Sequence, residues 1–227
     1  MVSATKTSGH TLQIADGLWL DKKFKAAMMK SIAQSELDRK RFVYSDIGFI
    51  LLQQVVEAVT GKTLDAYLVS EFYRPMGLEH TLFQPLNRYK KADIMPTAAN
   101  DYLRRQDLCG YVHDEAAFMG GVSGNAGLFA TAQELGKIYQ MILNEGELDG
   151  KRYLRPETCR IFTTEKSAVS HRGLGYDKPN LKDPKANACA SSAPASVYGH
   201  TGFTGTCAWV DPENDLVYIF LSTRLCP

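Results

Sequence analysis

The sequence lacks the features that would place the protein in a membrane or on a nucleic acid. None of its apolar runs approaches the roughly 18 residues that a membrane-spanning helix requires, so we expect no membrane span. The 26 basic and 25 acidic residues nearly cancel, and no basic stripe or acidic tail occurs, so nucleic acid is not an expected partner. The N-terminal stretch MVSATKTSGH also lacks the apolar segment of a secretory signal.

Metal-binding clusters and closely spaced cysteine pairs are missing as well. The cysteines lie far apart, with no CxxC or zinc-knuckle spacing, at Cys109, Cys159, Cys189, Cys207 and Cys226. Their odd number leaves at least one thiol unpaired within the chain, and the redox compartment stays open. His113, Asp114 and Glu115 are consecutive, but no second cluster accompanies them, so they do not indicate a metal site. We expect neither a metal nor a cofactor.

What the chain does contain is helical periodicity followed by β periodicity. Apolar spacing predicts helices over these ranges: 21–37, 47–60, 64–73, 132–143 and 157–163. The second of them has a wide apolar stripe and ends at Gly61, so we expect that helix to be central. Thr131 and Glu134 fit a capping box at the start of the fourth helix.

The C-terminal end predicts strands. Two apolar runs, 207–210 and 216–222, are joined by the polar residues 211–215, which predicts a β-hairpin. The glycines of 120–127 indicate a tight turn, and 178–196 is typical of an exposed loop. Helices followed by strands favour an α+β fold, in which an antiparallel sheet is flanked by helices beside a helical lobe.

Two short polar stretches are candidates for chemistry. Tyr44-Ser45-Asp46 precedes the central helix, where Tyr44 and Asp46 can face a cleft and the helix N-terminus favours an anion. The plain alternative is that Ser45 or Asp46 caps the helix while Tyr44 packs beside it. A His-Thr-Gly triplet at 200–202 opens what we expect to be an edge strand, and its glycine allows a ligand to approach closely. The plain alternative is a loop-to-strand transition with a hydrogen-bonded histidine.

Three stretches containing these residues carry a family resemblance. They are "FVYSDIGFILLQQVVEAVTGKTLDAYLVSEFYRPMGLEHTLF", "YVHDEAAFMGGVSGNAGLFATAQELGKIYQMIL" and "YGHTGFTGTCAWVDPENDLVYIFLSTR". Together they cover roughly residues 42–225 in the right order. The chain resembles the serine β-lactamase and penicillin-binding-protein superfamily, nearest to class C β-lactamases and related D-alanyl-D-alanine peptidases and esterases. The resemblance implies a sheet with helices on both sides and a cleft beside a helical region.

The resemblance also implies roles for individual residues. A serine followed one helical turn later by a lysine, in a Ser-x-x-Lys motif, would perform acyl transfer. Tyr44 would correspond to the tyrosine that relays a proton to and from that serine. His200 and Thr201 would bind the substrate carboxylate and support Tyr44, and the backbone N–H of Phe203 would be an oxyanion-hole donor. Gly202 would let the substrate lie along the strand as an extra strand.

Two positions depart from the family pattern. Asp46 stands where β-lactamases have asparagine, and a carboxylate cannot donate the amide hydrogen bond that asparagine gives to a substrate. His200 replaces the lysine common in β-lactamases, and a neutral imidazole helps a substrate carboxylate less than an ammonium does. Both changes argue against efficient β-lactam hydrolysis and favour a peptidase or an esterase.

The nucleophile is the weakest part of the match. Ser3 and Lys6 form the only Ser-x-x-Lys near the N-terminus, but a Thr-Ser-Gly run follows, which is a poor opening for a helix. We interpret this motif as a chance occurrence and expect the chain to lack the family's N-terminal part. It would then be one incomplete domain over 1–227, with a helical part over about 12–165 and a C-terminal sheet part over about 166–227.

The leading interpretation is therefore the C-terminal part of a β-lactamase-related serine hydrolase, inactive alone. It would act on an amide or ester in a small-molecule, peptide or cell-wall-like substrate. The resemblance implies a periplasmic or extracytoplasmic location and allows a fusion to a glycoside hydrolase domain in a longer protein. Two alternatives stay open: an active hydrolase that uses Ser3 and Lys6, and a non-catalytic binding or accessory domain of a larger cell-envelope protein, for which Asp46 is the support.

Overall fold

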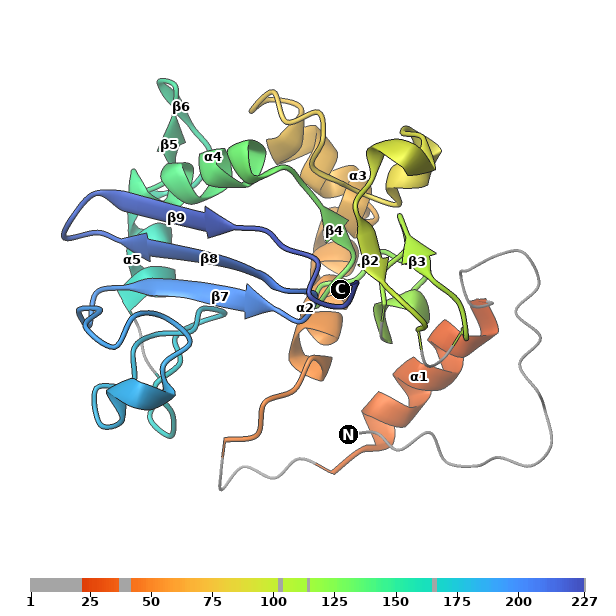
Figure 1. Cartoon of the computed structure of the whole chain (residues 1–227), viewed down its shortest axis with the longest axis horizontal. Helices are drawn as coiled ribbons and strands as arrows, with labels where there is room; N and C mark the ends of the chain where they lie inside the picture. The colour runs from red at the N-terminus through yellow and green to blue at the C-terminus, as the bar shows by residue number, and fades with distance from the viewer. Residues whose placement is uncertain (1–21, 37–41, 102–103, 114, 165–166, 227) are drawn as a thin grey trace.

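An antiparallel sheet near the C-terminus organises the structure (Figure 1). The computed structural model describes residues 22–36, 42–101, 104–113, 115–164 and 167–226. Within them, three strands pair in the order β7 (Tyr198–Gly202), β8 (Thr206–Asp211) and β9 (Leu216–Phe220). β8 and β9 form the predicted hairpin, and β7 is an edge strand of the sheet, as expected.

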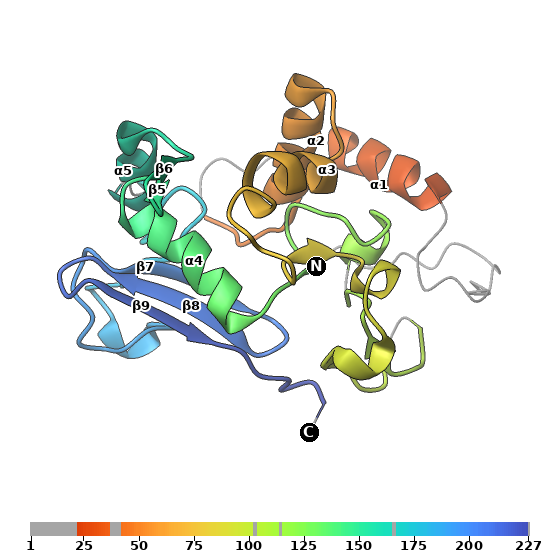
Figure 2. The ribbon, with the colours of Figure 1, turned by 90° about the horizontal axis from the view of Figure 1, so that it is seen from above.

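α4 (Ala132–Leu143) lies between this sheet and a second layer of the molecule. Figure 2 shows it running over β8 and β9, which it contacts. On its other side Met141 belongs to a buried cluster whose remaining members are Tyr73, Met76, Leu78 and Leu148. α5 (Pro156–Thr164) follows, with proline in its first turn as predicted.

The capping box predicted at the start of α4 is only half formed. Thr131 Oγ1 accepts a hydrogen bond from the Glu134 N–H at 3.3 Å, so Thr131 is the N-cap. The Glu134 carboxylate instead accepts from the N–H groups of Glu79 and His80, at 2.9–3.0 Å, and from Thr81 Oγ1 at 2.7 Å. Glu134 therefore anchors the 79–81 segment, because its carboxylate satisfies several donors there at once.

The predicted central helix is present but is not central. α2 (Ile47–Thr60) ends at Gly61, whose φ of +66° is the left-handed conformation expected of a helix C-terminus. Only Ile50 and Gln53 are buried within it, whereas its other apolar side chains reach 81% exposure at Val59. The expectation of a buried stripe is therefore wrong for the described residues, which cover only one side of the helix.

The remaining helices lie on the same side of the molecule as α2. α1 (Lys22–Gln34) contacts the rest through the edge-to-face pair Phe24–Phe118, with ring centroids 5.9 Å apart. α3 (Leu64–Leu68) continues into a π-helical turn, Val69–Tyr73. Among the described residues, no helix is both long enough and apolar enough to cross a membrane.

Short antiparallel ribbons join the helices. They pair β1 (Leu82–Phe83) with β4 (Leu128–Phe129), β2 (Pro96–Ala98) with β3 (Leu108–Cys109), and β5 (Glu147–Leu148) with β6 (Lys151–Arg152). Single 3₁₀ turns occur at Pro85–Asn87, Lys91–Asp93, Glu115–Ala117 and Pro184–Ala186. Helices and antiparallel strands are thus mixed along the chain, which confirms the α+β class.

The glycine turn at 120–127 holds the start of α2 in place. A Cβ at Gly124 would collide with the carbonyl oxygen of Phe49, so only glycine lets the turn approach the helix backbone this closely. One turn further along α2, Gln53 Nε2 donates to the Val122 carbonyl at 3.1 Å and to Glu57 Oε1 at 3.0 Å. These contacts fix the first turns of α2, and Tyr44 lies just ahead of that helix.

Candidate active site

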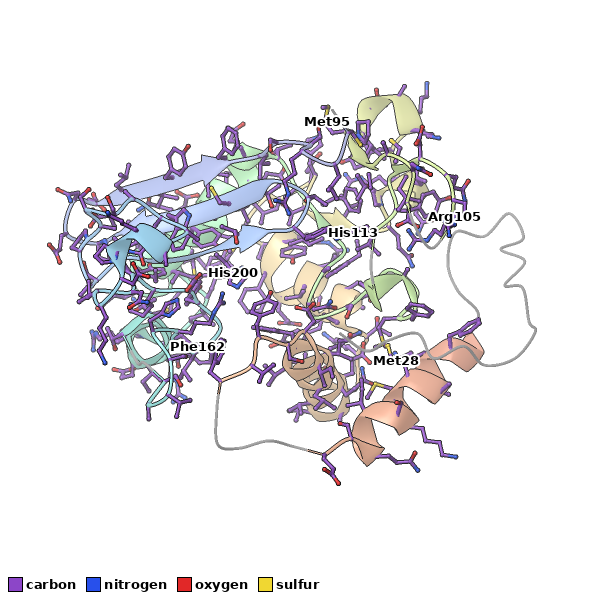
Figure 3. All side chains as sticks on the ribbon, turned by 60° about the horizontal axis from the view of Figure 1, so that its bottom comes forward. Met28, Met95, Arg105, His113, Phe162 and His200 are labelled. Atoms are coloured by element: carbon purple, nitrogen blue, oxygen red, sulfur yellow. The ribbon has the colours of Figure 1, made fainter. Side chains whose placement is uncertain are left out.

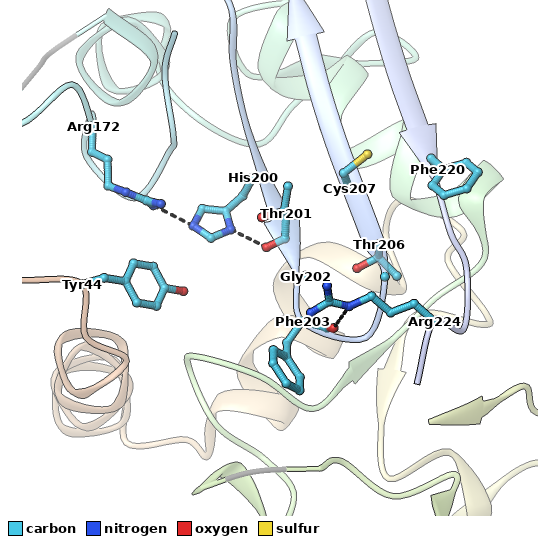
Figure 4. Close-up of a pocket in the computed structure, with 11 residues that line it drawn as sticks. Tyr44, Arg172, His200, Thr201, Gly202, Phe203, Thr206, Cys207, Phe220 and Arg224 are labelled. Carbon is cyan, nitrogen blue, oxygen red and sulfur yellow. Dashed lines mark hydrogen bonds between the residues drawn. The ribbon is translucent and has the colours of Figure 1, made fainter. Parts of the chain in front are cut away.

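Tyr44 and His200 meet across a cavity between the segment ahead of α2 and the strand β7. Their ring centroids lie 6.3 Å apart, and the cavity has a volume of about 510 Å³. Figure 4 shows the Tyr44 hydroxyl pointing into it. The lining residues are Tyr44, Arg172, His200, Thr201, Gly202, Phe203, Gly205, Thr206, Cys207, Phe220 and Arg224.

The His-Thr-Gly triplet ends its strand and does not open it. β7 begins at Tyr198, which is 2% exposed and pairs with Val210, and it ends at Gly202. The turn that follows is closed by the Gly205 N–H donating to the Gly202 carbonyl at 3.0 Å. The expected start was wrong because a Tyr-Gly pair resembles a loop, although here it fills the core and pairs with β8. The triplet therefore lies where β7 reaches the cavity.

Of the residues Tyr44, Ser45 and Asp46, only Tyr44 lines the cavity. Ser45 Oγ accepts from the Ile47 N–H at 3.2 Å, and the Asp46 carbonyl accepts from the Ile50 N–H at 3.1 Å, so both residues help to start α2. Asp46 is absent from the residues that line the cavity in the described part of the chain. Ser3 and Lys6 fall outside the described residues.

Sequence reasoning missed Arg172, which joins the two walls of the cavity. Its Nη1 lies 2.9 Å from His200 Nε2, and its guanidinium lies over the Tyr44 ring, 4.9 Å from the centroid. A guanidinium can only donate, so Nε2 of His200 accepts. The proton of the imidazole is then on Nδ1, which donates to the Thr201 carbonyl at 2.6 Å. His200 is consequently held as the neutral Nδ1–H tautomer.

Asp177 sets the position of Arg172. Its carboxylate contacts Arg172 Nη2 at 3.3 Å and His171 Nε2 at 3.0 Å. Its backbone exchanges two hydrogen bonds with Gly199 of β7, at 2.7 and 3.1 Å. The signal that could have revealed this group is the run HRGLGYD at 171–177, where charged residues flank a glycine-rich turn.

Phe203 closes the opposite end of the cavity. Its ring stacks on His113, with centroids 4.9 Å apart and an interplanar angle of 5°, and the Arg224 guanidinium lies 5.0 Å from its centroid. Arg224 Nε donates to the Phe203 carbonyl at 2.6 Å. Figure 3 labels His113 and His200, with Met28 on α1 at the lower right of the view. No group of three or more metal-binding side chains occurs among the residues that the structure describes.

The charges around the cavity favour an anionic ligand. Arg172 and Arg224 line it, whereas no carboxylate does within the described residues. Tyr44 and Thr201 add hydroxyl groups. By contrast, the side chain of Tyr198, at the start of β7, is 2% exposed, and its burial raises the pKa of its phenol. Tyr44 is 55% exposed, so it is the tyrosine that a ligand can reach.

Comparison with known proteins places these residues in a family. A family model described as Beta-lactamase matches residues 4–227. An Escherichia coli (strain K12) protein named "Putative D-alanyl-D-alanine carboxypeptidase" is 37% identical over 197 residues, which make up 81% of this chain and 45% of that protein. An N-acetylmuramyl-L-alanine amidase from Bacillus subtilis (strain 168) is 35% identical over 197 residues, which make up 81% of this chain and 44% of the amidase. The chain therefore spans about half the length of the curated relatives it matches.

Solved structures show the same fold at low sequence identity. A penicillin-binding protein homologue from Caulobacter crescentus has a TM-score of 0.61 at 19% identity, covering 89% of this chain and 58% of its own. EstCE1, described as a hydrolase with promiscuous acyltransferase activity, has a TM-score of 0.61 at 20% identity, covering 92% of this chain and 59% of its own. The predicted resemblance to β-lactamases and penicillin-binding proteins is confirmed.

Proposed function

This chain belongs to the beta-lactamase family, and we propose that it supplies the tyrosine–histidine wall of an acyl-transfer site in a serine hydrolase. The observation that carries the proposal is the meeting of Tyr44 and His200 across one cavity, from segments far apart in the sequence. The reaction is hydrolysis of an amide or ester through an acyl-serine.

Each residue at the cavity has a role in this proposal. Tyr44 takes the proton of the attacking serine and returns it to the leaving group, because its hydroxyl points into the cavity. The Phe203 N–H is a donor for the oxyanion, at the turn where β7 ends. Thr201 binds the substrate from β7, and the missing side chain of Gly202 lets the substrate approach the strand.

The edge of β7 suits an extended substrate. The backbone groups of Gly199 pair with Asp177, and those of Thr201 face the same side because backbone direction alternates along a strand. Beyond that bridge, an acyl peptide can add to the strand. The cationic lining favours a substrate with a carboxylate. We propose a small or cell-wall-like peptide substrate and an extracytoplasmic location, which the names of the E. coli and B. subtilis relatives support.

We also propose that the acyl group forms on a serine other than Ser3. Ser3-Ala4-Thr5-Lys6 is the single Ser-x-x-Lys of the sequence, and a polar, glycine-containing run follows it instead of an apolar helix. A catalytic Ser-x-x-Lys needs a helix, since that spacing brings the two side chains to one face.

A chimera tests the proposal. The part of the E. coli relative that lies outside the matched region is joined to this chain, and hydrolysis of a D-alanyl-D-alanine peptide and a p-nitrophenyl ester is measured. We expect the chimera to turn over the substrates. In its Tyr44→Phe variant, the turnover rate should fall about 100-fold or more, which is the effect expected for loss of a general acid–base group. The matched control is Tyr218→Phe, because Tyr218 is similarly exposed, at 51%, and does not line the cavity.

The chain alone provides the second half of the test. Incubation with a fluorophosphonate and reading of the intact mass should show no adduct on Ser3. An adduct there, with turnover, would support the alternative that Ser3 and Lys6 are catalytic. A chimera that binds the peptide but does not turn it over would support the non-catalytic binding domain.

A further inference from the structure

The turn that joins β7 to β8 is closed from within and held from outside. Within it, the Gly205 N–H donates to the Gly202 carbonyl at 3.0 Å. From outside, Arg224 makes two hydrogen bonds: its Nε donates to the Phe203 carbonyl at 2.6 Å, and its backbone N–H donates to the Thr204 carbonyl at 3.1 Å. Figure 4 shows the first of these as a dashed line. One residue from beyond β9 thus engages two successive carbonyls of the turn.

The side chain of Phe203 is restrained by contacts and not by burial. The residue is 61% exposed, so the surrounding protein does not enclose it. The Arg224 guanidinium lies 5.0 Å from the centroid of its ring, and the His113 ring stacks on it at 4.9 Å. Arg224 therefore holds both the backbone and the ring of Phe203.

The segment that carries Arg224 is itself anchored on two sides. The Ser222 hydroxyl donates to the Gly205 carbonyl at 2.5 Å, and the Leu225 carbonyl accepts from the Ala99 N–H at 2.9 Å. A Cβ at Gly205 would lie only 2.5 Å from the Ser222 Oγ and 3.0 Å from the Arg224 Cβ, so glycine allows the two segments to approach this closely. Arg224 is thus fixed before it acts on the turn.

The Phe203 N–H is left available by these contacts. Its peptide plane contains the Gly202 carbonyl, and the next plane contains the Phe203 carbonyl, because peptide units are planar. Both carbonyls accept hydrogen bonds, so the two planes that meet at Phe203 are fixed. Within the described part of the chain, the Phe203 N–H donates no backbone hydrogen bond. It can therefore donate to a ligand atom in one set direction.

We propose that Arg224 is a positioning residue of the acyl-transfer site: it holds the turn at 202–205 so that the Phe203 N–H keeps one direction as the oxyanion donor. The inference rests on the proposed function, which gives that N–H its role. An oxyanion donor stabilises the transition state only if it is in place before the charge develops. A guanidinium suits this task because its Nε–H donates in the plane of the group while its flat face covers the Phe203 ring.

The chimera described above provides the first test. Arg224→Gln and Arg224→Lys are compared on the anionic D-alanyl-D-alanine peptide and on an uncharged p-nitrophenyl ester. We expect kcat to fall about tenfold or more in both variants and on both substrates, with KM little changed, because a misplaced donor weakens binding of the transition state alone. The matched control is Arg160→Gln, which should keep the full rate. Arg160 also donates through Nε, to Glu145 at 2.7 Å, but does not line the cavity.

The two substrates and the lysine variant separate positioning from attraction by charge. If Arg224 acted by attracting a substrate carboxylate, its loss would raise KM for the peptide, spare the ester, and be largely repaired by lysine. Either a loss confined to the peptide or a full rate in Arg224→Lys would overturn the inference. An unchanged kcat in Arg224→Gln would overturn it as well.

A second measurement, on the 227-residue chain, requires no turnover. In ¹H–¹⁵N spectra the Phe203 and Thr204 amide resonances should shift and broaden in both Arg224 variants, whereas that of Trp209, within β8, should not. Unchanged Phe203 and Thr204 resonances would show that Arg224 does not hold the turn. Arg224→Lys keeps the charge and remains informative if Arg224→Gln fails to fold. A chimera without turnover would instead overturn the proposed function, so the two failures are distinguishable.

Discussion

The helices α2 and α4 show how differently the two walls of the cavity are supported. In α4 no residue from 134 to 143 is exposed, because the sheet covers one side and the cluster around Met141 the other. In α2, Leu52, Val55 and Val59 are 56–81% exposed, although the helix is the more apolar of the two. The wall that carries His200 therefore belongs to a sheet that is backed by the buried helix α4. The wall that carries Tyr44 instead adjoins α2, which has one apolar side exposed to solvent.

This difference explains why the position of Tyr44 depends on a few close contacts. The side chains at 42–44 are 43–58% exposed, so burial does not fix them. Arg172 lies over the rings of Phe42 and Tyr44, and the start of α2 that follows them is held by Gly124 against Phe49 and by the bond from Gln53 to Val122. Substitutions on α4 should therefore change stability, and substitutions where α2 meets the glycine turn should change the site as well.

The largest effect is expected in the cluster beneath α4. Met141 is 3% exposed and packs with Tyr73, Met76, Leu78 and Leu148. Met141→Ala should lower the free energy of unfolding by about 3 kcal/mol, because truncating a buried methionine loses its transfer free energy and leaves a cavity. Denaturant unfolding of both proteins measures it. A cost below about 1 kcal/mol would contradict the idea that α4 is fully packed.

A smaller cost, with a change at the site, is expected at Gly124. In Gly124→Ala the new Cβ would meet the carbonyl oxygen of Phe49, which is backbone and cannot rotate away. Overpacking of this kind costs about 2 kcal/mol, and the start of α2 must move to relieve it. Gly136→Ala is the control, because a Cβ there meets nothing within 4 Å. Unfolding measures the cost, and the Tyr44 ring resonances should shift in Gly124→Ala alone.

Local signals in the sequence were enough to predict most of the helices and the hairpin. Gly61 after the stripe of α2, Thr131 ahead of α4 and Pro156 at the start of α5 all lie at helix boundaries in the structure. These signals work because capping and turn formation depend on neighbouring residues. The meeting of Tyr44 and His200 followed from a family pattern, not from any property of either segment alone.

What the sequence did not reveal depends on contacts between distant segments. The carboxylate of Glu134 bonds to residues 79–81, and Arg172 contacts both His200 and Asp177, whose backbone pairs with Gly199. The contact of Glu134 has no short-range signature, and the run 171–177 marks the position of Arg172 only as a charged, glycine-rich turn. The exposure of α2 is a third case. Its apolar stripe predicts that other residues cover the helix, but the stripe does not show whether the described residues are the ones that cover it.

Glu134 gives a prediction that depends on pH. Burial acts to raise the pKa of its carboxyl, but the hydrogen bonds from Thr81, from His80 and from the backbone of Glu79 outweigh burial and lower it. A lowered pKa stabilises the folded state above the ordinary pKa of glutamate, and that contribution is lost as pH falls through the folded value. Glu134→Gln should therefore cost about 1.5 kcal/mol at neutral pH, through loss of charge-assisted bonds.

The pH dependence separates this cause from a general loss of packing. The difference in stability between wild type and Glu134→Gln should shrink as pH falls below the ordinary range of glutamate. Unfolding by urea over a series of pH values measures it. Glu36→Gln is the matched control, since Glu36 is exposed and none of the hydrogen bonds to Glu134 involves it. A constant difference at all pH values would mean that the carboxylate charge is not what anchors residues 79–81.

The smallest effect is expected on the open side of α2, and it tests the comparison most directly. Val59→Ala removes two methyl groups from a residue that is 81% exposed, so the free energy of unfolding should change by no more than about 0.5 kcal/mol, and alanine's better helix propensity offsets part of any loss. Ile50→Val removes one methyl group from a residue that is 2% exposed, yet should cost about 1 kcal/mol. If Val59→Ala costs more than Ile50→Val, that side of α2 is covered in solution by protein beyond the described residues, and the wall behind Tyr44 is as firmly supported as the one behind His200.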